Sequence, residues 1–253
     1  MECTSPKIVV VGSLNVDHTL RVSRIPCPGE TLVAREIRTC LGGKGANQAV
    51  AAARAGGSVR MIGCVGRDDD GDRYLEALRA EGINTNGIVR SETPTGSAFI
   101  AVDDAGENTI IVHPGANLDL SLADIDRQAE QLRAADALLL QLECPLSVVR
   151  YAAALARKAG VKVLLNPSPL DSAFLADPFE VDVLIANEGE AGLIAPNRTL
   201  REARCHQLLI TRGARSTLCI TAEGVAEFVP PRVIPVDTVG AGDTFAGVFA
   251  VSN

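Results

Sequence analysis

The sequence predicts an α/β fold of three layers, αβα, in which helices cover both faces of a mostly parallel central sheet. Short runs rich in Val, Ile and Leu recur along the chain without alternating with polar residues, as strands buried on both faces do. Helical segments lie between most of these runs, and this alternation of strand and helix favours a layered α/β architecture. The apolar runs span residues 7–14, 59–65, 137–142, 161–166, 181–186 and 207–211.

Three of the intervening segments have helical features. Residues 44–56 are rich in alanine, and residues 70–82 place Tyr74 and Leu78 on one helical face. Residues 146–160 end in two basic residues followed by glycine, which is a typical helix stop. We therefore expect helices over these three segments.

Two other segments alternate apolar and polar residues, as half-exposed strands do. They are residues 16–40 and 96–112, and the second reads as a hairpin around the turn DDAGEN. We expect them to form a small antiparallel β lid, while residues 1–15, 41–95 and 113–253 form the main α/β domain. A sheet with one apolar face needs a partner surface, which is the mouth of the site, a second subunit, or both.

The composition excludes several classes of protein. The chain of 253 residues fits one large domain, and its net charge of −7 disfavours binding to nucleic acid. No apolar run approaches the ~18 residues that span a bilayer, and none near the N-terminus resembles a signal peptide. The seven cysteines are odd in number and contain no C-x-x-C pair, so we expect reduced thiols and a cytoplasmic protein.

A glycine-rich segment, LGGKGANQA (41–49), precedes the first helix. It reads either as a loop that begins the helix, or as a site where exposed amides and the side chains of Lys44 and Asn47 hold a polyhydroxyl ligand. It lacks the Walker A pattern, and no G-x-G-x-x-G follows the first strand, which disfavours a dinucleotide-binding dehydrogenase.

A second glycine-rich segment, DTVGAGD (237–243), leads into an apolar helix. The amides of Gly240, Ala241 and Gly242 are placed to form an anion hole at the helix N-terminus. Asp243 either caps this helix or acts as a general base that accepts a proton from a hydroxyl as a phosphate arrives. Asp237 begins the turn and either caps it or binds a cation.

Further polar residues follow the buried strands. Asn15 and Asp17 point to the same side of an extended segment, where they either bind vicinal hydroxyls or form an Asx turn. Glu143, NPSP (166–169) and NEGE (187–190) each follow a later strand. Open α/β sheets bind ligands at the carboxyl ends of their strands, so these groups indicate a single cleft.

Together these segments resemble the ribokinase (PfkB) family of carbohydrate kinases. GGKGANQA (42–49) is similar to the N-terminal signature of that family, and DTVGAGDTFAG (237–247) is similar to its C-terminal signature. Shorter motifs match in order and spacing, and they are PGET (28–31), TPTG (93–96), PGAN (114–117), LECP (142–145), NPSP and NEGE. The resemblance runs from about Ile8 to Phe249, and it is closer to the members that act on ribose than to those that act on adenosine, fructose or ketodeoxygluconate.

The resemblance implies a role for each matching residue. Asp243 would be the general base, beside an anion hole formed by the amides of residues 240–242. The sugar-binding residues would be Asn15, Asp17, Gly43, Lys44, Asn47, Glu143 and Asp243. The nucleotide-binding residues would be Asn187, Thr211, Gly213, Ser216 and Gly242. Glu190 would help to hold Mg²⁺ through water, and Asp237 with the backbone of Val239 would bind a monovalent cation.

The resemblance also implies a reaction. ATP would phosphorylate the 5-hydroxyl of D-ribose to give ribose 5-phosphate, with Mg²⁺ as cofactor, activation by K⁺, and a homodimer formed through the β lid. The alternatives are a kinase of deoxyribose, adenosine, ketodeoxygluconate or another sugar, and a non-catalytic homologue that binds a sugar or nucleotide. Aromatic residues make up 3% of the chain and Trp is absent, so a bare pentose is favoured over a nucleobase that needs stacking.

The sequence departs from the family pattern at two places. Members of the family continue beyond the second signature with helices and a loop over the adenine that also completes the cation site. Because the sequence ends at Asn253, we expect the C-terminal part of the kinase domain to be missing from this chain. Residues 189–206 are also shorter than the family usually has, and Pro196 is expected to stop a helix there.

Overall fold

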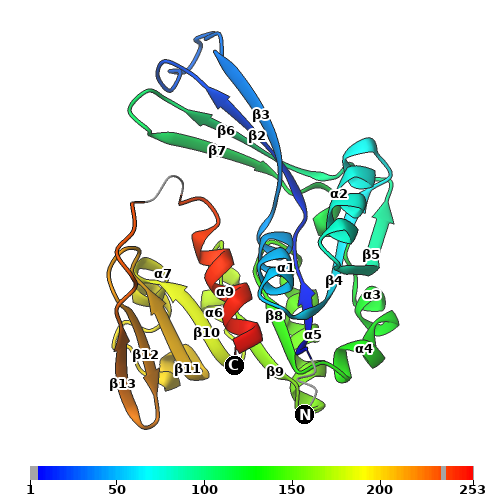
Figure 1. Cartoon of the computed structure of the whole chain (residues 1–253), viewed down its shortest axis with the longest axis vertical. Coiled ribbons are helices and arrows are strands. Elements are labelled where there is room, and N and C mark those ends of the chain that lie inside the picture. The colour runs from blue at the N-terminus through cyan, green and yellow to red at the C-terminus, as the bar shows by residue number, and fades with distance from the viewer. Residues whose placement is uncertain (1–4, 235–237, 253) are drawn as a thin grey trace.

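The computed structural model describes residues 5–234 and 238–252, and every element named below lies within these ranges (Figure 1). In this part of the chain the main sheet has nine strands in the order β13-β12-β11-β10-β9-β8-β1-β4-β5. Neighbours from β11 to β5 are parallel, whereas β12 and β13 add an antiparallel edge. The strands are β1 (Lys7–Val11), β4 (Ser58–Gly66), β5 (Asn84–Ser91), β8 (Ala137–Leu140), β9 (Lys162–Leu165), β10 (Val181–Asn187), β11 (Cys205–Thr211), β12 (Thr217–Thr221) and β13 (Gly224–Phe228).

Helices cover both faces of this sheet. One face carries α1 (Lys44–Arg54), α2 (Asp69–Ala80) and α9 (Ala241–Ser252). The other face carries α3 (Leu122–Arg127), α4 (Ala129–Arg133), α5 (Leu146–Lys158), α6 (Ser172–Ala176), α7 (Glu188–Ile194) and α8 (Leu200–Ala203). A short 3₁₀ helix, η1 (Gly115–Asp119), precedes α3.

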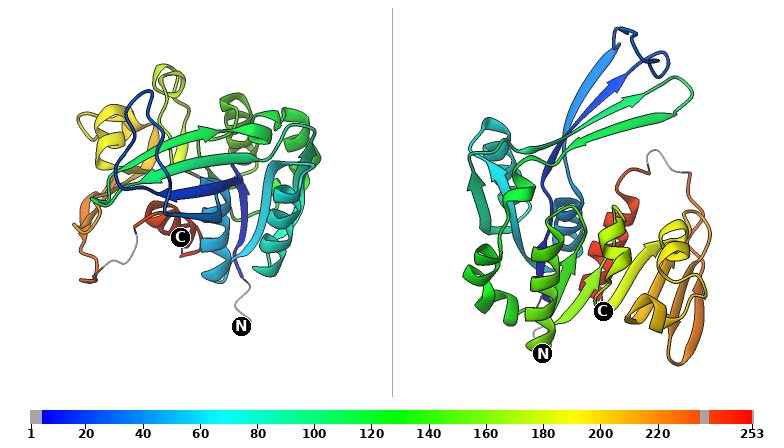
Figure 2. Two further views of the ribbon diagram at one scale, coloured as in Figure 1. Left: turned by 90° about the horizontal axis from the view of Figure 1, so that it is seen from above. Right: turned by 180° about the vertical axis from the view of Figure 1, so that it is seen from behind.

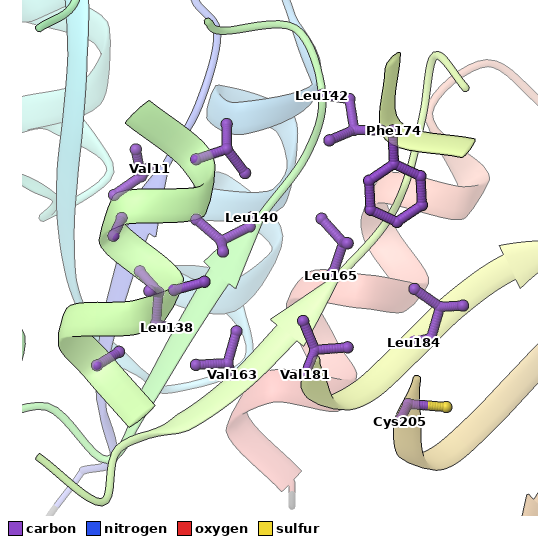
Figure 3. Packing of buried hydrophobic residues seen from close by; sticks show 14 of the residues in the cluster. Val11, Leu138, Leu140, Leu142, Val163, Leu165, Phe174, Val181, Leu184 and Cys205 are labelled. Atoms are coloured by element: carbon purple, nitrogen blue, oxygen red, sulfur yellow. The ribbon is translucent and has the colours of Figure 1, made fainter. Parts of the chain in front are cut away.

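The continuous apolar strands explain why the sheet is buried on both faces. Successive side chains of a strand point to opposite faces, so one apolar run supplies two cores. Leu138 and Leu140 of β8 lie on the face of α5 together with Val163 and Leu165 of β9 (Figure 3). Leu139, between the first two, belongs to the core under α1 and α9. The predicted three-layer α/β fold with a mostly parallel sheet is therefore confirmed.

A second, smaller sheet rises from one end of the main domain (Figures 1 and 2). Its strands, in the order β3-β2-β6-β7, are β2 (Asn15–Arg21), β3 (Glu36–Gly42), β6 (Gly96–Val102) and β7 (Asn108–His113). The hairpins β2–β3 and β6–β7 are antiparallel as expected, but β2 and β6 pair in parallel. β2 and β6 follow the parallel strands β1 and β5, and both leave the main sheet at its carboxyl edge, so they run in the same direction.

Some elements differ from the sequence expectations. The predicted helices appear as α1, α2 and α5 with ends shifted by a few residues, whereas β5, β12 and β13 were not predicted. The segment 189–206 holds most of α7 and all of α8, and α7 ends before Pro196. None of the helices in the described ranges is long and apolar enough to cross a membrane.

Candidate active site

A cavity of about 160 Å³ lies where the carboxyl ends of β9, β10 and β11 meet the N-termini of α1 and α9. Most of its lining is polar, and seven of the residues predicted to form the site line it together with Asp243. The lining residues are Lys44, Asn166, Ser168, Ile185, Asn187, Glu190, Thr211, Thr238, Gly240, Ala241, Gly242 and Asp243.

Asp243 is buried at the wall of this cavity, with 6% of its surface exposed. Its Oδ2 accepts a hydrogen bond of 3.1 Å from Nδ2 of Asn47, and its Oδ1 accepts one of 3.0 Å from Nε2 of Gln48. Both donors belong to α1, whereas Asp243 is the third residue of α9. Asp243 therefore lies inside the first turn of its helix rather than at the capping position before it.

The turn before α9 holds the residues that were predicted to form an anion hole. The amide of Thr244 donates to the carbonyl of Gly240 at 2.8 Å. The amides of residues 241–243, which come before it in the first turn, therefore have no acceptor within the helix. The amide of Ala241 donates to the carbonyl of Thr238 at 3.2 Å, so one of the three predicted amides already has a partner in this turn. Val239 is exposed beside this turn, and Asp237 lies outside the described residues.

Two carboxylates approach one another on the sugar side of the predicted site. Glu143 accepts one hydrogen bond from the hydroxyl of Ser13 and another, of 3.0 Å, from the amide of Lys44, which begins α1. Burial and the nearby charge of Glu143 raise the pKa of Asp17 to about 6. Asp17 lies on β2, so one carboxylate of this pair belongs to the small sheet and the other to the main domain.

Asn15 is buried at the start of β2, and its orientation is set by a neighbour. Its Oδ1 accepts a hydrogen bond of 2.8 Å from Nδ2 of Asn117, so the oxygen of the amide faces Asn117 and its nitrogen points away from that residue. Gly43, before α1, has a φ of 83°, and a Cβ there would lie 2.7 Å from the backbone nitrogen of Asn15. A side chain at position 43 would therefore collide with the strand that carries Asn15.

The predicted nucleotide-binding residues separate into two groups. Asn187 and Glu190 line the cavity with Thr211, and they form a reciprocal capping box at the start of α7, with bonds of 2.8 and 2.9 Å. Gly213 and Ser216 lie in the turn between β11 and β12, outside the cavity lining. The hydroxyl of Ser216 is buried against polar side chains of this turn and β13.

The lining of the cavity includes a carboxylate for the expected divalent ion. Mg²⁺ in phosphoryl-transfer sites usually takes one or two carboxylates and keeps several waters. Glu190 offers one carboxylate to the cavity, and its Oε2 already accepts the amide of Asn187. This donor set fits Mg²⁺ held through water. Within the described residues, no group of three His, Cys, Asp or Glu side chains is placed to enclose an ion.

Sequence reasoning missed several buried polar residues that support this site. All are buried, and four of the five fall in or directly beside the quoted motifs, which was the available signal. They are Ser13, Gln48, Asn117, Gln141 and Asn166.

Known proteins are similar to this chain in sequence and in fold. Ribokinase from Haemophilus influenzae is 38% identical over 261 residues, which cover 97% of this chain and 84% of that protein. Deoxyribokinase from Salmonella typhi is 36% identical over 260 residues, which cover 96% and 84%. The solved structure of Arabidopsis thaliana ribokinase complexed with ribose and ATP matches with a TM-score of 0.85 and 32% identity, covering 98% of this chain and 86% of that one.

The model of the family described as pfkB family carbohydrate kinase matches residues 5–252. This match spans nearly the whole sequence and includes both glycine-rich segments. The chain therefore belongs to the pfkB family of carbohydrate kinases.

Proposed function

We propose that this carbohydrate kinase is a ribokinase, which transfers the γ-phosphoryl group of ATP to the 5-hydroxyl of D-ribose and yields ribose 5-phosphate and ADP. The observation that carries the proposal is the place of Asp243. It is a buried carboxylate in the first turn of α9, directly beside the glycine turn and the polar cavity. The ribokinase relatives, similar over nearly the whole chain, support ribose as the sugar.

The proposed chemistry uses Asp243 as a general base. As the 5-oxygen of ribose attacks the γ-phosphorus, Oδ2 of Asp243 accepts the hydroxyl proton, and the bond from that phosphorus to the β–γ bridging oxygen breaks. The hydroxyl separates the carboxylate from the phosphoryl group, so their like charges do not meet directly. The amides of Gly240, Ala241 and Gly242, at the end of the glycine turn and the start of α9, would stabilise the charge on the phosphoryl oxygens.

Ribose would lie between the small sheet and the start of α1. Asn15 would donate from its amide nitrogen, while Asp17 and Glu143 would accept from hydroxyls. Gly43, Lys44 and Asn47 would close the other side, because they begin α1 and lie beside Asp243 or Asn15. A site built to hydrogen-bond each hydroxyl rejects an analogue that lacks one, since its own polar groups are then left unpaired.

ATP would enter from the side of α7. Asn187 and Thr211 line the cavity and would contact the nucleotide, with Gly213 and Ser216 farther along the next turn. When bound, Mg²⁺ neutralises phosphate charge, and Glu190 would hold its water shell. We place the monovalent cation, K⁺, at Asp237 and the backbone of Val239, as the family resemblance implies.

Two further properties complete the proposal. The small sheet would act as a lid and pair two subunits in a homodimer. The protein would reside in the cytoplasm, because the six cysteines among the described residues are free thiols.

A coupled assay that follows ADP release over a panel of sugars tests this function. We expect D-ribose to be preferred over 2-deoxyribose, and both over adenosine, because the predicted site offers polar partners and none of the residues predicted to form it is aromatic. Preference for 2-deoxyribose would instead indicate a deoxyribokinase, which is the activity named for the relative from Salmonella typhi. ADP release with none of these sugars would overturn the proposal.

The role of Asp243 is tested in the same assay. Asp243→Asn should lower kcat by about 10²-fold or more, because it removes the proton acceptor, while calorimetry should show nearly unchanged ribose affinity. A variant that keeps more than about a tenth of wild-type turnover would contradict a base role.

A further inference from the structure

A chain of buried side-chain amides lies directly behind Asp243. Gln48 is fully buried in α1, and its Nε2 donates to Oδ1 of Asp243 at 3.0 Å and to Oδ1 of Asn166 at 3.2 Å. Its Oε1 accepts a hydrogen bond of 2.6 Å from Nε2 of Gln141, another fully buried residue. The amide of Gln48 therefore has a partner for both donor protons and for its oxygen.

The direction of this chain is fixed by a group that can only accept. Nδ2 of Asn166 donates to the backbone carbonyl of Ile185 at 2.9 Å. Asn166 must therefore turn its oxygen toward Gln48, and Gln48 must turn its nitrogen toward both Asn166 and Asp243. The carbonyl of Ile185 in β10 therefore determines, through Asn166, that Gln48 presents its Nε2 to Oδ1 of Asp243.

This arrangement is not what stability alone favours. Oε1 of Gln141 is buried and has no hydrogen-bond partner among the described residues. A buried polar atom without a partner destabilises the folded state, and apolar residues of the same shape would fill this space at less cost. The unpaired oxygen of Gln141 lowers stability, so we look for a function of this amide chain where Gln48 contacts the carboxylate of Asp243.

We propose that Gln48 is a positioning residue for phosphoryl transfer, oriented by Gln141 and Asn166. By holding Oδ1 of Asp243, it fixes the rotation of the carboxylate and directs Oδ2 toward the hydroxyl that loses its proton. Gln48 is buried behind Asp243 and acts only through it, whereas Asn47 is partly exposed and borders the sugar. The inference rests on the proposed base role of Asp243.

The consequence for catalysis follows from geometry. A carboxylate that rotates away from the reacting hydroxyl loses near-attack alignment, which affects the chemical step more than the binding of the sugar. If the hydrogen bond from Gln48 to the charged carboxylate is lost, kcat should fall by roughly one to two powers of ten, which is the energy of such a bond expressed as a rate. The split between kcat and ribose affinity therefore distinguishes positioning from a contact with the sugar.

The test compares three substitutions by methionine, which keeps the length of glutamine without its amide. Gln48→Met should lower kcat at least about tenfold, with ribose affinity by calorimetry within about twofold of wild type. Gln141→Met should lower kcat in the same direction by a smaller factor, because it releases the orientation of Gln48. Gln131→Met is the matched control, since Gln131 lies in α4 on the opposite face of the sheet and also carries a buried, unpartnered Oε1.

Each outcome decides the question. Unchanged kcat in Gln48→Met overturns the inference, as does a loss that appears equally in Gln131→Met or that resides in ribose affinity. If thermal unfolding shows that Gln48→Met does not fold, Gln141→Met carries the test, and unchanged kcat there overturns the inference. Asp243→Asn is measured alongside. If it stays active, the proposed base role fails, whereas an inactive Asp243→Asn beside a fully active Gln48→Met refutes the positioning role alone.

Discussion

Asp17 has the clearest conflict between stability and function among single residues of this site. Its carboxyl lies in a half-buried place near Glu143, and both burial and that charge raise its pKa from 3.8 to about 6. His18 next to it acts in the opposite direction and lowers this pKa. A carboxylate held against its electrostatic preference is a common feature of ligand-binding sites, where the ligand's hydroxyl groups supply the missing partners.

Replacing Asp17 by Asn should therefore stabilise the free protein at pH 8. Because the folded-state pKa lies above the unfolded value, the folded state holds an extra proton between pH 3.8 and about 6, and stability falls as pH rises through this window. The gain at pH 8 should be on the order of 1 kcal/mol after allowance for solvent screening. Urea unfolding at pH 8 and at pH 3.5 measures it. The gain should vanish at the lower pH, and a less stable variant at pH 8 would refute the argument.

At the scale of elements, the contact between α1 and α9 brings two side-chain amides of α1 to the carboxylate of Asp243. α1 carries Asn47 and Gln48, while α9 carries Asp243. The helices approach closely at Gly247, where a Cβ would lie 2.4 Å from the carbonyl oxygen of Gln48. The glycine thus sets the distance at which the amides of α1 reach the carboxylate.

Gly247→Ala should destabilise the protein by about 1–3 kcal/mol, because the added methyl group forces the two helices apart. It should also lower kcat, since Gln48 and Asp243 then separate. Gly192→Ala is the matched control. Gly192 lies in α7 with open space around its Cβ position, so alanine there should raise stability by about 0.4–1 kcal/mol. Thermal unfolding of both variants checks this, and equal effects would argue against close packing as the cause.

The elements also show what a single sequence can predict. β1 and β8 were predicted because both of their faces are buried, which leaves continuous apolar runs. β5 has polar residues and a glycine, and β13 is exposed along its whole length, so neither carries that pattern.

In the candidate site, too, only residues that belong to a local sequence pattern could be predicted. Asp243 and Asn187 were identified because each follows a recognisable strand or turn. The role of Gln48 depends on Gln141 and Asn166, which lie about a hundred residues away in sequence. Their contact exists only because parallel strands bring distant segments to one edge of the sheet.

At the scale of the whole molecule, the small sheet stands away from the main domain (Figure 2). Several of its large apolar side chains are exposed. In the register of the sheet, Asp17 lies beside Ala98, and Ala98 lies beside Val112, so all three share one face. Ile110 lies on the same face two residues before Val112, and these two side chains are 53% and 50% exposed. The apolar surface therefore continues from Asp17 toward the tip of the sheet.

A second copy of the lid would cover this face and would also keep water from the sugar site. We therefore expect a dimer in sedimentation at micromolar concentration, and Ile110→Lys should shift it to a monomer because the charge would be buried without a partner. Val225→Lys is the control, since Val225 is 66% exposed on β13, far from the lid, and should leave the dimer intact. A monomeric wild-type protein, or a dimer that survives Ile110→Lys unchanged, would rule out this face as the interface. Weaker ribose binding by the monomeric variant, with Asp17 and Glu143 intact, would tie closure of the site to assembly.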